Sequence, residues 1–416
     1  MLTRRGFIGT LGAAALAACG PPAPRRGAAT LVFKHGKLFG DPGVLRALID
    51  EFERAHPGVA VREETLPASS DEQHQFYAIN LQAGSDAFDV LAVDIIWVAG
   101  FARAGWLRDL GALERKAFFD GPMEAVTWRD AAYAAPWFID AGLLYYRKDL
   151  LEKYGLAPPE YWNDLVRNAR AVMAREPGLH GFVWQGKQYE GLVCNALEYL
   201  HSNGGAVLSG GRVVLDSPQN REALALMADL VHRYRVTPGS VTTATEEPSR
   251  HVFGQGRAAF LRNWPYAWRL FQDPSSRVHG KVGVAELPHF PGGRSSATLG
   301  GWQLAVNAAS RHQEIASSFV NFLTGEKAQK RLAIAYGFQP ARVALYADAE
   351  LLAAQPFLGR LERVFAAARP RPVTPQYVRV SQVLQSDFSA AISGLKTPRA
   401  ALAHAQARIE EILDAG

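Results

Sequence analysis

The sequence predicts an α/β protein built from two lobes, and its composition, length and element order support this prediction. The chain has 416 residues, of which 48% are hydrophobic and 20% are charged, as in soluble globular proteins. One hydrophobic core rarely serves more than about 250–300 residues, so a chain of this length is expected to divide. Strand and helix patterns alternate for about a hundred residues in the first part of the chain, which is typical of an α/β lobe.

The first lobe is predicted to begin with alternating strands and helices. Apolar residues recur at helical spacing in its first helix, which ends at His56-Pro57-Gly58. The order strand, helix, strand implies a parallel pair with a right-handed crossover. Ligands of such lobes bind beyond the carboxyl ends of the strands, so Asp94 is placed to face a cleft. The predicted elements are a strand over 30–34, a helix over 44–52, a strand over 59–63, a helix over 71–82 and a strand over 88–93.

The rest of the chain is predicted to contain more helix than strand. Ser217 and Pro218 supply an N-cap and a first-turn proline for one of its helices. Gly300 and Gly301 stand before an alternating strand, where bare backbone can approach a ligand closely. The predicted elements are strands over 143–146, 281–287 and 297–306, helices over 161–175, 189–202 and 218–234, and a helical region from residue 314 onward.

A carboxylate interrupts an extended apolar segment in the middle of the chain. Asp140 follows Trp137 and Phe138 at the break, and Tyr145 lies in the strand that comes next. Burying a carboxylate unpaired costs several kcal/mol, so a cation or the hydroxyls of a ligand are expected to meet it. The alternative interpretation is a loop aspartate that hydrogen-bonds to nearby backbone.

The charge of the chain gives no indication of a nucleic-acid partner. The formal net charge is +5, but Arg4, Arg5, Arg25 and Arg26 lie in the first 26 residues, which contain no acidic residue. The body therefore has 41 basic and 40 acidic residues, and a basic binding face is not expected. The second of the two cysteines, Cys194, is interpreted as a small buried hydrophobe.

The N-terminus has the pattern of an export signal followed by a lipid attachment site. A pair of arginines precedes a short apolar stretch and small residues, so residues 1–18 are predicted to be a twin-arginine signal peptide. The apolar stretch is shorter than the roughly 20 residues that span a bilayer. Cys19 follows the small residues directly, as in a lipobox, which predicts a lipid on Cys19 and a tether over residues 19–29. A plain cleaved leader with an incidental cysteine is the alternative.

Aromatic and acidic residues suggest a sugar ligand or, as an alternative, an enzyme that acts on glycosides. Four aromatic residues lie near glycine or proline in loop-like settings, and aromatic faces stack on sugar rings: Trp264, Tyr266, Trp268 and Trp302. Asp94 and Asp140 form a carboxylate pair of the kind a secreted glycosidase uses. No nucleophile or zinc motif is present in the sequence. The aromatic residues also fit a structural cluster under a loop, or an open polysaccharide-binding platform.

Five runs in the body of the chain resemble the sugar-binding proteins of ABC importers, of the trehalose/maltose-binding type. The resemblance covers about residues 30 to 415. The runs are 142–155, 182–194, 263–268, 287–292 and 298–302.

The resemblance implies a two-lobe periplasmic-binding-protein fold in which the chain crosses between the lobes three times. The crossings are expected near Asp140, Ala297 and Gly325, with residues 30–138 plus 298–324 in the N-terminal lobe and 141–296 plus 326–416 in the C-terminal lobe. Hinge closure is expected to enclose an α-linked disaccharide such as trehalose or maltose. The implied partners are the permease subunits of an importer, with a monomer held at the membrane through the lipid only. No catalysis, metal or cofactor is expected.

The resemblance also assigns a set of sugar contacts. Arg371 fits the family's late Arg-Pro better than the neighbouring Arg369. Asp41 or Gly43, and His74 or Gln75, match two further family positions. Phe138 stands where the family has a tyrosine, which removes a hydroxyl. The assigned contacts are Asp94, Asp140, Trp264, Tyr266, Gly300, Gly301, Trp302, Arg371, Asp41 and His74.

The lipid anchor leads to a direct prediction. Cys19→Ser removes the thiol that carries the lipid, so the variant should leave the membrane fraction while the purified protein keeps its sugar affinity. Fractionation of cells that express either form measures this. Wild-type protein that is already free in the soluble exported fraction would contradict the lipobox.

Overall fold

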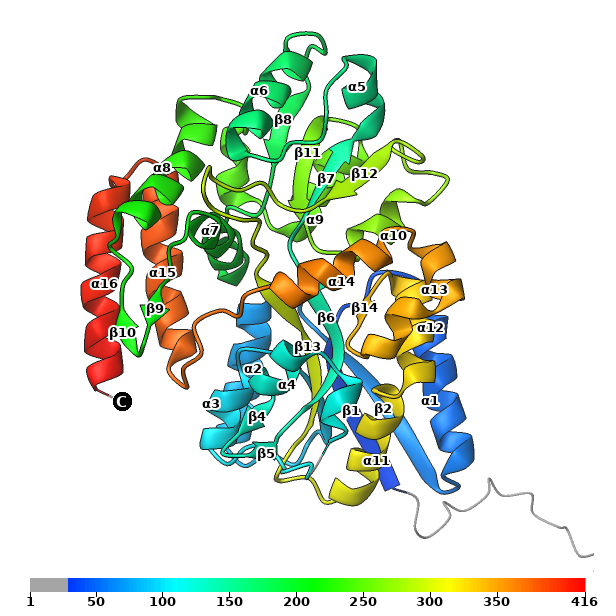
Figure 1. The fold of residues 1–416 in the computed structure, drawn as a ribbon. Helices are drawn as coiled ribbons and strands as arrows, with labels where there is room; N and C mark the ends of the chain where they lie inside the picture. Colours follow the sequence, from blue (N-terminus) through cyan, green and yellow to red (C-terminus); the bar gives the residue numbers. More distant parts are fainter. Residues whose placement is uncertain (1–28, 112, 416) are drawn as a thin grey trace, which may run out of the picture.

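The computed structural model describes residues 29–111 and 113–415. The predicted leader, Cys19 and the tether, apart from Ala29, lie outside these residues. Within them the chain forms two large sheets and two small two-stranded ones, and each large sheet is the centre of one lobe (Figure 1). The predicted two-lobe α/β fold is therefore confirmed.

A six-stranded sheet with the order β14-β6-β13-β3-β1-β2 forms the N-terminal lobe. β1 pairs in parallel with β2 and β3, which confirms the predicted parallel pair. β13 runs antiparallel to both of its neighbours, β3 and β6. The chain up to β6 contributes β1 (Ala29–Gly36), α1 (Gly43–Ala55), β2 (Val59–Leu66), α2 (Ser70–Gln82), β3 (Val90–Asp94), α3 (Val98–Arg103), α4 (Asp120–Ala125), β4 (Thr127–Trp128), β5 (Ala131–Ala132) and β6 (Ala135–Ala141).

The chain returns to this lobe after passing through the second one. The returning elements are β13 (Leu299–Val306), α11 (Gln313–Leu323), α12 (Glu326–Tyr336), β14 (Gln339–Pro340), α13 (Ala349–Ala354) and α14 (Leu358–Ala367).

The C-terminal lobe is built on a four-stranded sheet with the order β12-β7-β11-β8. Its helix α7 is buried along its whole length, and α15 and α16 pack beside α7 and α8 (Figure 1). The elements are β7 (Leu143–Arg147), α5 (Lys148–Lys153), α6 (Trp162–Met173), β8 (His180–Val183), α7 (Glu190–Ser202), β9 (Leu208–Ser209), β10 (Arg212–Val213), α8 (Pro218–His232), α9 (Glu246–Gly254), β11 (Ala258–Asn263), α10 (Ala267–Phe271), β12 (Val282–Ala285), α15 (Tyr377–Ile392) and α16 (Pro398–Asp414).

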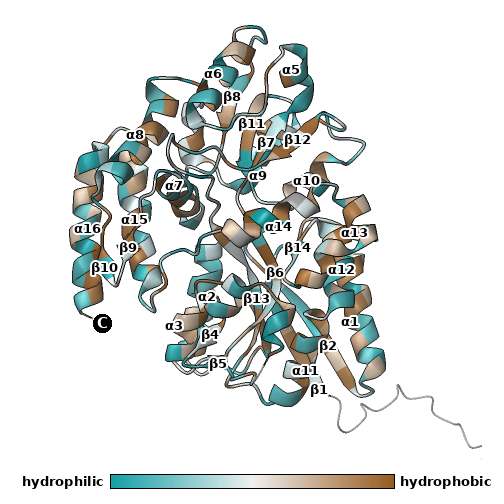
Figure 2. Ribbon diagram, viewed as in Figure 1, coloured by the Kyte–Doolittle hydropathy of each residue, from teal (hydrophilic) through white to brown (hydrophobic). Residues whose placement is uncertain are grey.

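The outer helices carry both hydrophobic and hydrophilic residues (Figure 2). In α1 the buried residues Leu45, Leu48, Ile49 and Phe52 recur at helical spacing, so one face packs on the sheet while the other meets solvent. In the part of the chain that the structure describes, no helix is both long enough and apolar enough to span a bilayer.

The chain crosses between the lobes at three places, and the third differs from the prediction. The first crossing is Gly142, between β6 and β7, and the second ends at Thr298, before β13. The third was expected near Gly325, but that residue only separates α11 from α12, which both lie in the N-terminal lobe. The chain crosses instead over residues 368–376, between α14 and α15.

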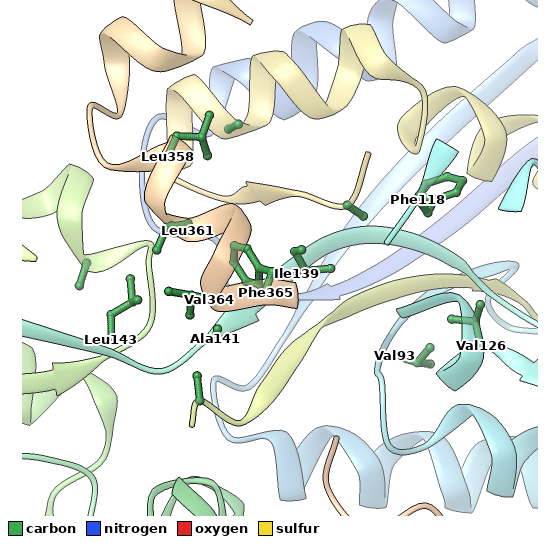
Figure 3. Close-up of a cluster of buried hydrophobic side chains, with 14 of the residues drawn as sticks. Val93, Phe118, Val126, Ile139, Ala141, Leu143, Leu358, Leu361, Val364 and Phe365 are labelled. Atoms are coloured by element: carbon green, nitrogen blue, oxygen red, sulfur yellow. The ribbon is translucent and has the colours of Figure 1, made fainter. Parts of the chain in front are cut away.

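Residues 326–367 therefore belong to the N-terminal lobe, and their predicted place in the C-terminal lobe is wrong. β14 pairs with β6, and the Tyr336 hydroxyl of α12 donates to the Asp41 carbonyl at 2.7 Å. Leu361, Val364 and Phe365 of α14 pack beside Ile139 and Ala141 of β6 (Figure 3). The helical pattern of this region predicts an apolar face but does not identify the sheet on which it packs.

A buried ion pair lies against the first crossing. The Arg262 Nε donates to the Glu198 carboxylate at 2.8 Å, and both side chains are at most 2% exposed. The same carboxylate accepts the Thr298 backbone N–H at 3.3 Å, at the end of the second crossing. A Cβ added to Gly142 would lie 1.9 Å from a Glu198 oxygen, so a side chain at this position does not fit.

Gly142→Ala should therefore lower the free energy of unfolding by about 1–3 kcal/mol or more, as overpacking of a close-packed interior does. Urea unfolding measures the difference. The control is Gly239→Ala, because a Cβ there meets nothing within 4 Å. Equal stability of the two variants would contradict the packing of Glu198 against the crossing.

Candidate functional site

A cavity of about 410 Å³ lies between the two lobes. It is lined by residues from the six-stranded sheet, from α2, α7 and α9, from the turn after β11, and from the third crossing. Eight of the predicted contacts line it together: Asp94, Asp140, Trp264, Tyr266, Gly300, Gly301, Trp302 and Arg371. Arg369 is not among the lining residues.

The register of the six-stranded sheet brings part of this set together. Trp302 of β13 pairs with Asp94 at the end of β3 and, on its other side, with Phe138 of β6. Gly300 pairs with Asp140 in the same way. Asp94 thus lies at the carboxyl end of a parallel strand, where ligands of α/β sheets bind.

Gly301 has a backbone conformation that requires glycine. Its φ is 117°, and an added Cβ would lie 2.4 Å from the Phe138 carbonyl oxygen. A bare backbone at this position lets β13 and β6 approach each other where they border the cavity.

A turn after β11 carries the aromatic pair Trp264 and Tyr266. The Asn263 side chain accepts the Trp264 backbone N–H at 2.8 Å, and the Tyr145 hydroxyl donates to the Trp264 carbonyl at 2.8 Å. The Arg262 guanidinium lies 3.9 Å from the centroid of the Trp264 ring. One face of the indole is therefore covered by a cation–π contact.

Arg371 joins the two lobes through carboxylates on either side. Its Nη1 donates to Glu190 of α7 at 2.9 Å, and its Nη2 donates to Asp94 at 2.5 Å. Burial opposes the charge of Arg371, but Asp94 and Glu190 favour it and its pKa is raised. The Nε of Arg371 is buried and has no partner among the described residues. Most of the arginine's donors are thus used to fix the protein rather than left for a ligand.

Asp140 differs from these paired charges. No described residue donates a hydrogen bond to its carboxylate or forms an ion pair with it. Burial raises the pKa of Asp140 to about 8, which Arg262 opposes and Asp94 reinforces. Neither an ion-pair partner nor a described backbone donor meets this carboxyl group, so the alternative of a loop aspartate bonded to backbone does not fit, and the hydroxyls of a ligand remain the expected partner.

Two predicted contacts, Asp41 and His74, do not line the cavity. The Asp41 carboxylate accepts the Gly43 backbone N–H at 2.9 Å in the exposed turn before α1. The His74 ring stacks on Phe101 of α3 at 5.4 Å and borders a separate cavity between α2 and α15, as does Gln75. Local capping and aromatic packing direct these side chains away from the residues that line the interlobe cavity.

A model of the family described as bacterial extracellular solute-binding protein matches residues 39–330. The chain belongs to the bacterial extracellular solute-binding protein family. This solute-binding protein is 40% identical over 353 residues to a probable ABC transporter-binding protein of Deinococcus radiodurans, with 83% of each chain covered. It is 26% identical to a mannitol-binding protein of Pseudomonas aeruginosa, over 87% of this chain and 88% of that one.

A solved structure extends the comparison to the whole fold. The maltose-bound MalE3 of T. maritima is 43% identical to this solute-binding protein and superposes with a TM-score of 0.89. The match covers 92% of this chain and 100% of that one.

Several lining residues of the solute-binding protein were not predicted. Glu190 lies within the run 182–194, so the resemblance contained a signal for it. Glu246 and Glu247 stand at the start of α9, where acidic residues usually indicate only a helix N-terminus. The others that bear on the argument are Phe39, Gln73 and Lys187. The residues that the structure describes contain no group of three or more His, Cys, Asp or Glu side chains placed to hold a metal ion.

The raised pKa of Asp140 predicts a pH dependence of stability. Asp140 stays protonated in the folded protein up to pH about 8 but ionises near its usual pKa of 3.8 in the unfolded chain. The folded state therefore binds more protons between these values, and the free energy of unfolding contributed by this group falls as the pH rises from about 4 to about 8.

Asp140→Asn removes this dependence, because the amide does not titrate. The variant should melt at a higher temperature than the wild type at pH about 8.5, with a smaller difference at pH about 4.5. Thermal unfolding of the sugar-free protein over this range measures the effect. Parallel melting curves at every pH would contradict the unpaired carboxyl group.

Proposed function

We propose that this protein is the substrate-binding component of an ABC sugar importer and that it holds an α-linked disaccharide, such as trehalose or maltose, in the interlobe cavity. Its size supports this, since ligand sites typically measure about 300–1,000 Å³, and this cavity measures about 410 Å³. Maltose in MalE3 of T. maritima, at 43% identity, supports the same ligand class.

The unpaired carboxyl group of Asp140 is the observation that carries the proposal. A desolvated carboxyl group without a partner is costly, and the hydroxyls of a sugar would satisfy it. Trp264, Tyr266 and Trp302 line the same cavity, and their rings suit the apolar C–H faces of a pyranose. A sugar has apolar C–H faces that match the aromatic rings and hydroxyls that match the carboxyl group. A purely apolar ligand would leave Asp140 without a hydrogen-bond partner.

The lobes contact each other around the cavity, as expected for a binding protein that encloses its ligand. Phe39 of the N-terminal lobe stacks on Tyr266 of the C-terminal lobe, with ring centroids 5.6 Å apart. Asp94, Arg371 and Glu190 bridge the lobes beside the same cavity. Opening by a hinge would admit the sugar, and the closed form would dock on the permease subunits as a monomer tethered through Cys19.

Calorimetry of the mature protein tests this proposal against trehalose, maltose, sucrose, glucose and mannitol. We expect the tightest binding for trehalose or maltose. Asp140→Ala should weaken that binding tenfold or more, because it leaves a buried sugar hydroxyl without its partner, which costs about 1–3 kcal/mol, and 1.4 kcal/mol corresponds to a factor of ten.

Circular dichroism of the variant is the control for its fold. An unchanged affinity in a folded Asp140→Ala variant would contradict the assignment of the site. Hydrolysis of a glycoside by the wild type, with no stable sugar complex, would favour instead the enzyme that uses Asp94 and Asp140.

A further inference from the structure

Two adjacent glutamates at the start of α9 line the interlobe cavity but differ in their partners. Glu247 accepts the Tyr266 hydroxyl at 2.7 Å and the Arg250 Nη2 at 2.6 Å, and the Arg250 Nε adds two further bonds. Glu246 forms no ion pair with any described residue, and its carboxylate accepts a long bond of 3.4 Å from the Trp264 Nε1. The Tyr189 hydroxyl also lies beside it. Glu247 is thus fully engaged, while Glu246 keeps acceptor capacity.

Glu246 and Asp140 lie at opposite edges of the Trp264 indole. The Nε1 atom, on the pyrrole side, points to the Glu246 carboxylate. The far edge of the benzene ring approaches Gly300, whose added Cβ would lie 3.4 Å from Trp264 Cζ3 and 3.5 Å from the Asp140 Cβ. Because Arg262 covers one face of the indole, the cavity can offer a ligand only the other face.

We propose that Glu246 is a ligand-binding residue that accepts hydroxyl hydrogens from the pyranose ring stacked on the free face of Trp264, at the edge opposite Asp140. The inference rests on the proposed sugar-binding function. A ring placed there presents its hydroxyls outward in its own plane, toward a carboxyl group at each edge.

This arrangement assigns different roles to the two glutamates. Glu246 determines which hydroxyls the stacked ring must carry, so it is a specificity residue. Glu247 holds the Tyr266 ring through its hydroxyl and is a positioning residue, since Arg250 and Tyr266 already occupy its oxygens. Changes at the two adjacent positions should therefore have different effects on sugar selectivity.

The test measures the affinity of maltose, trehalose and their monodeoxyfluoro derivatives for the wild type, Glu246→Ala and Glu247→Ala. Fluorine at the hydroxyl that faces Glu246 cannot donate, so the wild type should lose about tenfold or more in affinity for that derivative. Glu246→Ala should bind it as well as the parent sugar. Glu247→Ala, the matched control, should keep the wild-type pattern even if all affinities fall together.

Each outcome separates the two proposals. If the wild type binds neither maltose nor trehalose, the proposed function is wrong, and this inference fails with it. If the wild type binds but Glu246→Ala shows the same relative losses for every derivative, the function stands and the role of Glu246 is wrong. Glu246→Met, which keeps a similar side-chain length but has no oxygen acceptor, replaces the alanine variant if the latter does not fold.

Discussion

The buried ion pairs on one face of α7 are the interactions on which the arrangement of the lobes depends. Glu190, Cys194 and Glu198 are spaced four residues apart, so they lie along one side of the helix. Glu190 binds Arg371 of the third crossing, the Cys194 carbonyl accepts the Thr298 hydroxyl of the second, and Glu198 packs against Gly142 of the first. The single helix α7 thus contacts all three segments of the chain that connect the lobes.

Each of these buried ion pairs contributes little net stability, but neither partner can be removed without destabilising the fold. Removing one partner of a buried pair leaves the other charge desolvated, which costs about 3–5 kcal/mol. Burial raises the pKa of Glu190 and of Glu198, and Arg371 and Arg262 oppose this rise by favouring the ionised carboxylates. These ion pairs also contact residues that line the cavity: Arg371 binds Asp94, and Arg262 lies over the Trp264 ring. The segments that connect the lobes and the interlobe cavity therefore share charged residues.

Asp140 is the exception in this network, and the contrast explains its role. Most buried charges near the crossings have a partner of opposite sign, whereas Asp140 faces the cavity without one. Glu246 also lacks an ion-pair partner and accepts a long bond from Trp264, whereas the oxygens of the adjacent Glu247 are occupied by Arg250 and Tyr266. Acidic groups that form ion pairs within the protein stabilise its structure, whereas Asp140 and Glu246, which form none, line the cavity.

The sequence by itself determined the fold class, most of the elements and eight of the residues that line the cavity. Alternating patterns predicted β1, α1, β2, α2 and β3, because local periodicity follows from the chain that forms each element. The resemblance supplied the eight lining residues, since they lie in distinctive local runs.

Only the tertiary structure decided which sheet each later helix covers, which charges are paired and which side chains turn away. The apolar faces of α12 and α14 fit either lobe, so the third crossing was predicted near Gly325 instead of over residues 368–376. Asp41 and His74 matched family positions but are held elsewhere by a turn and by an aromatic contact. The difference between Glu246 and Glu247 depends on Arg250, Tyr266 and Trp264, whose contacts form only when the loops around the cavity pack together.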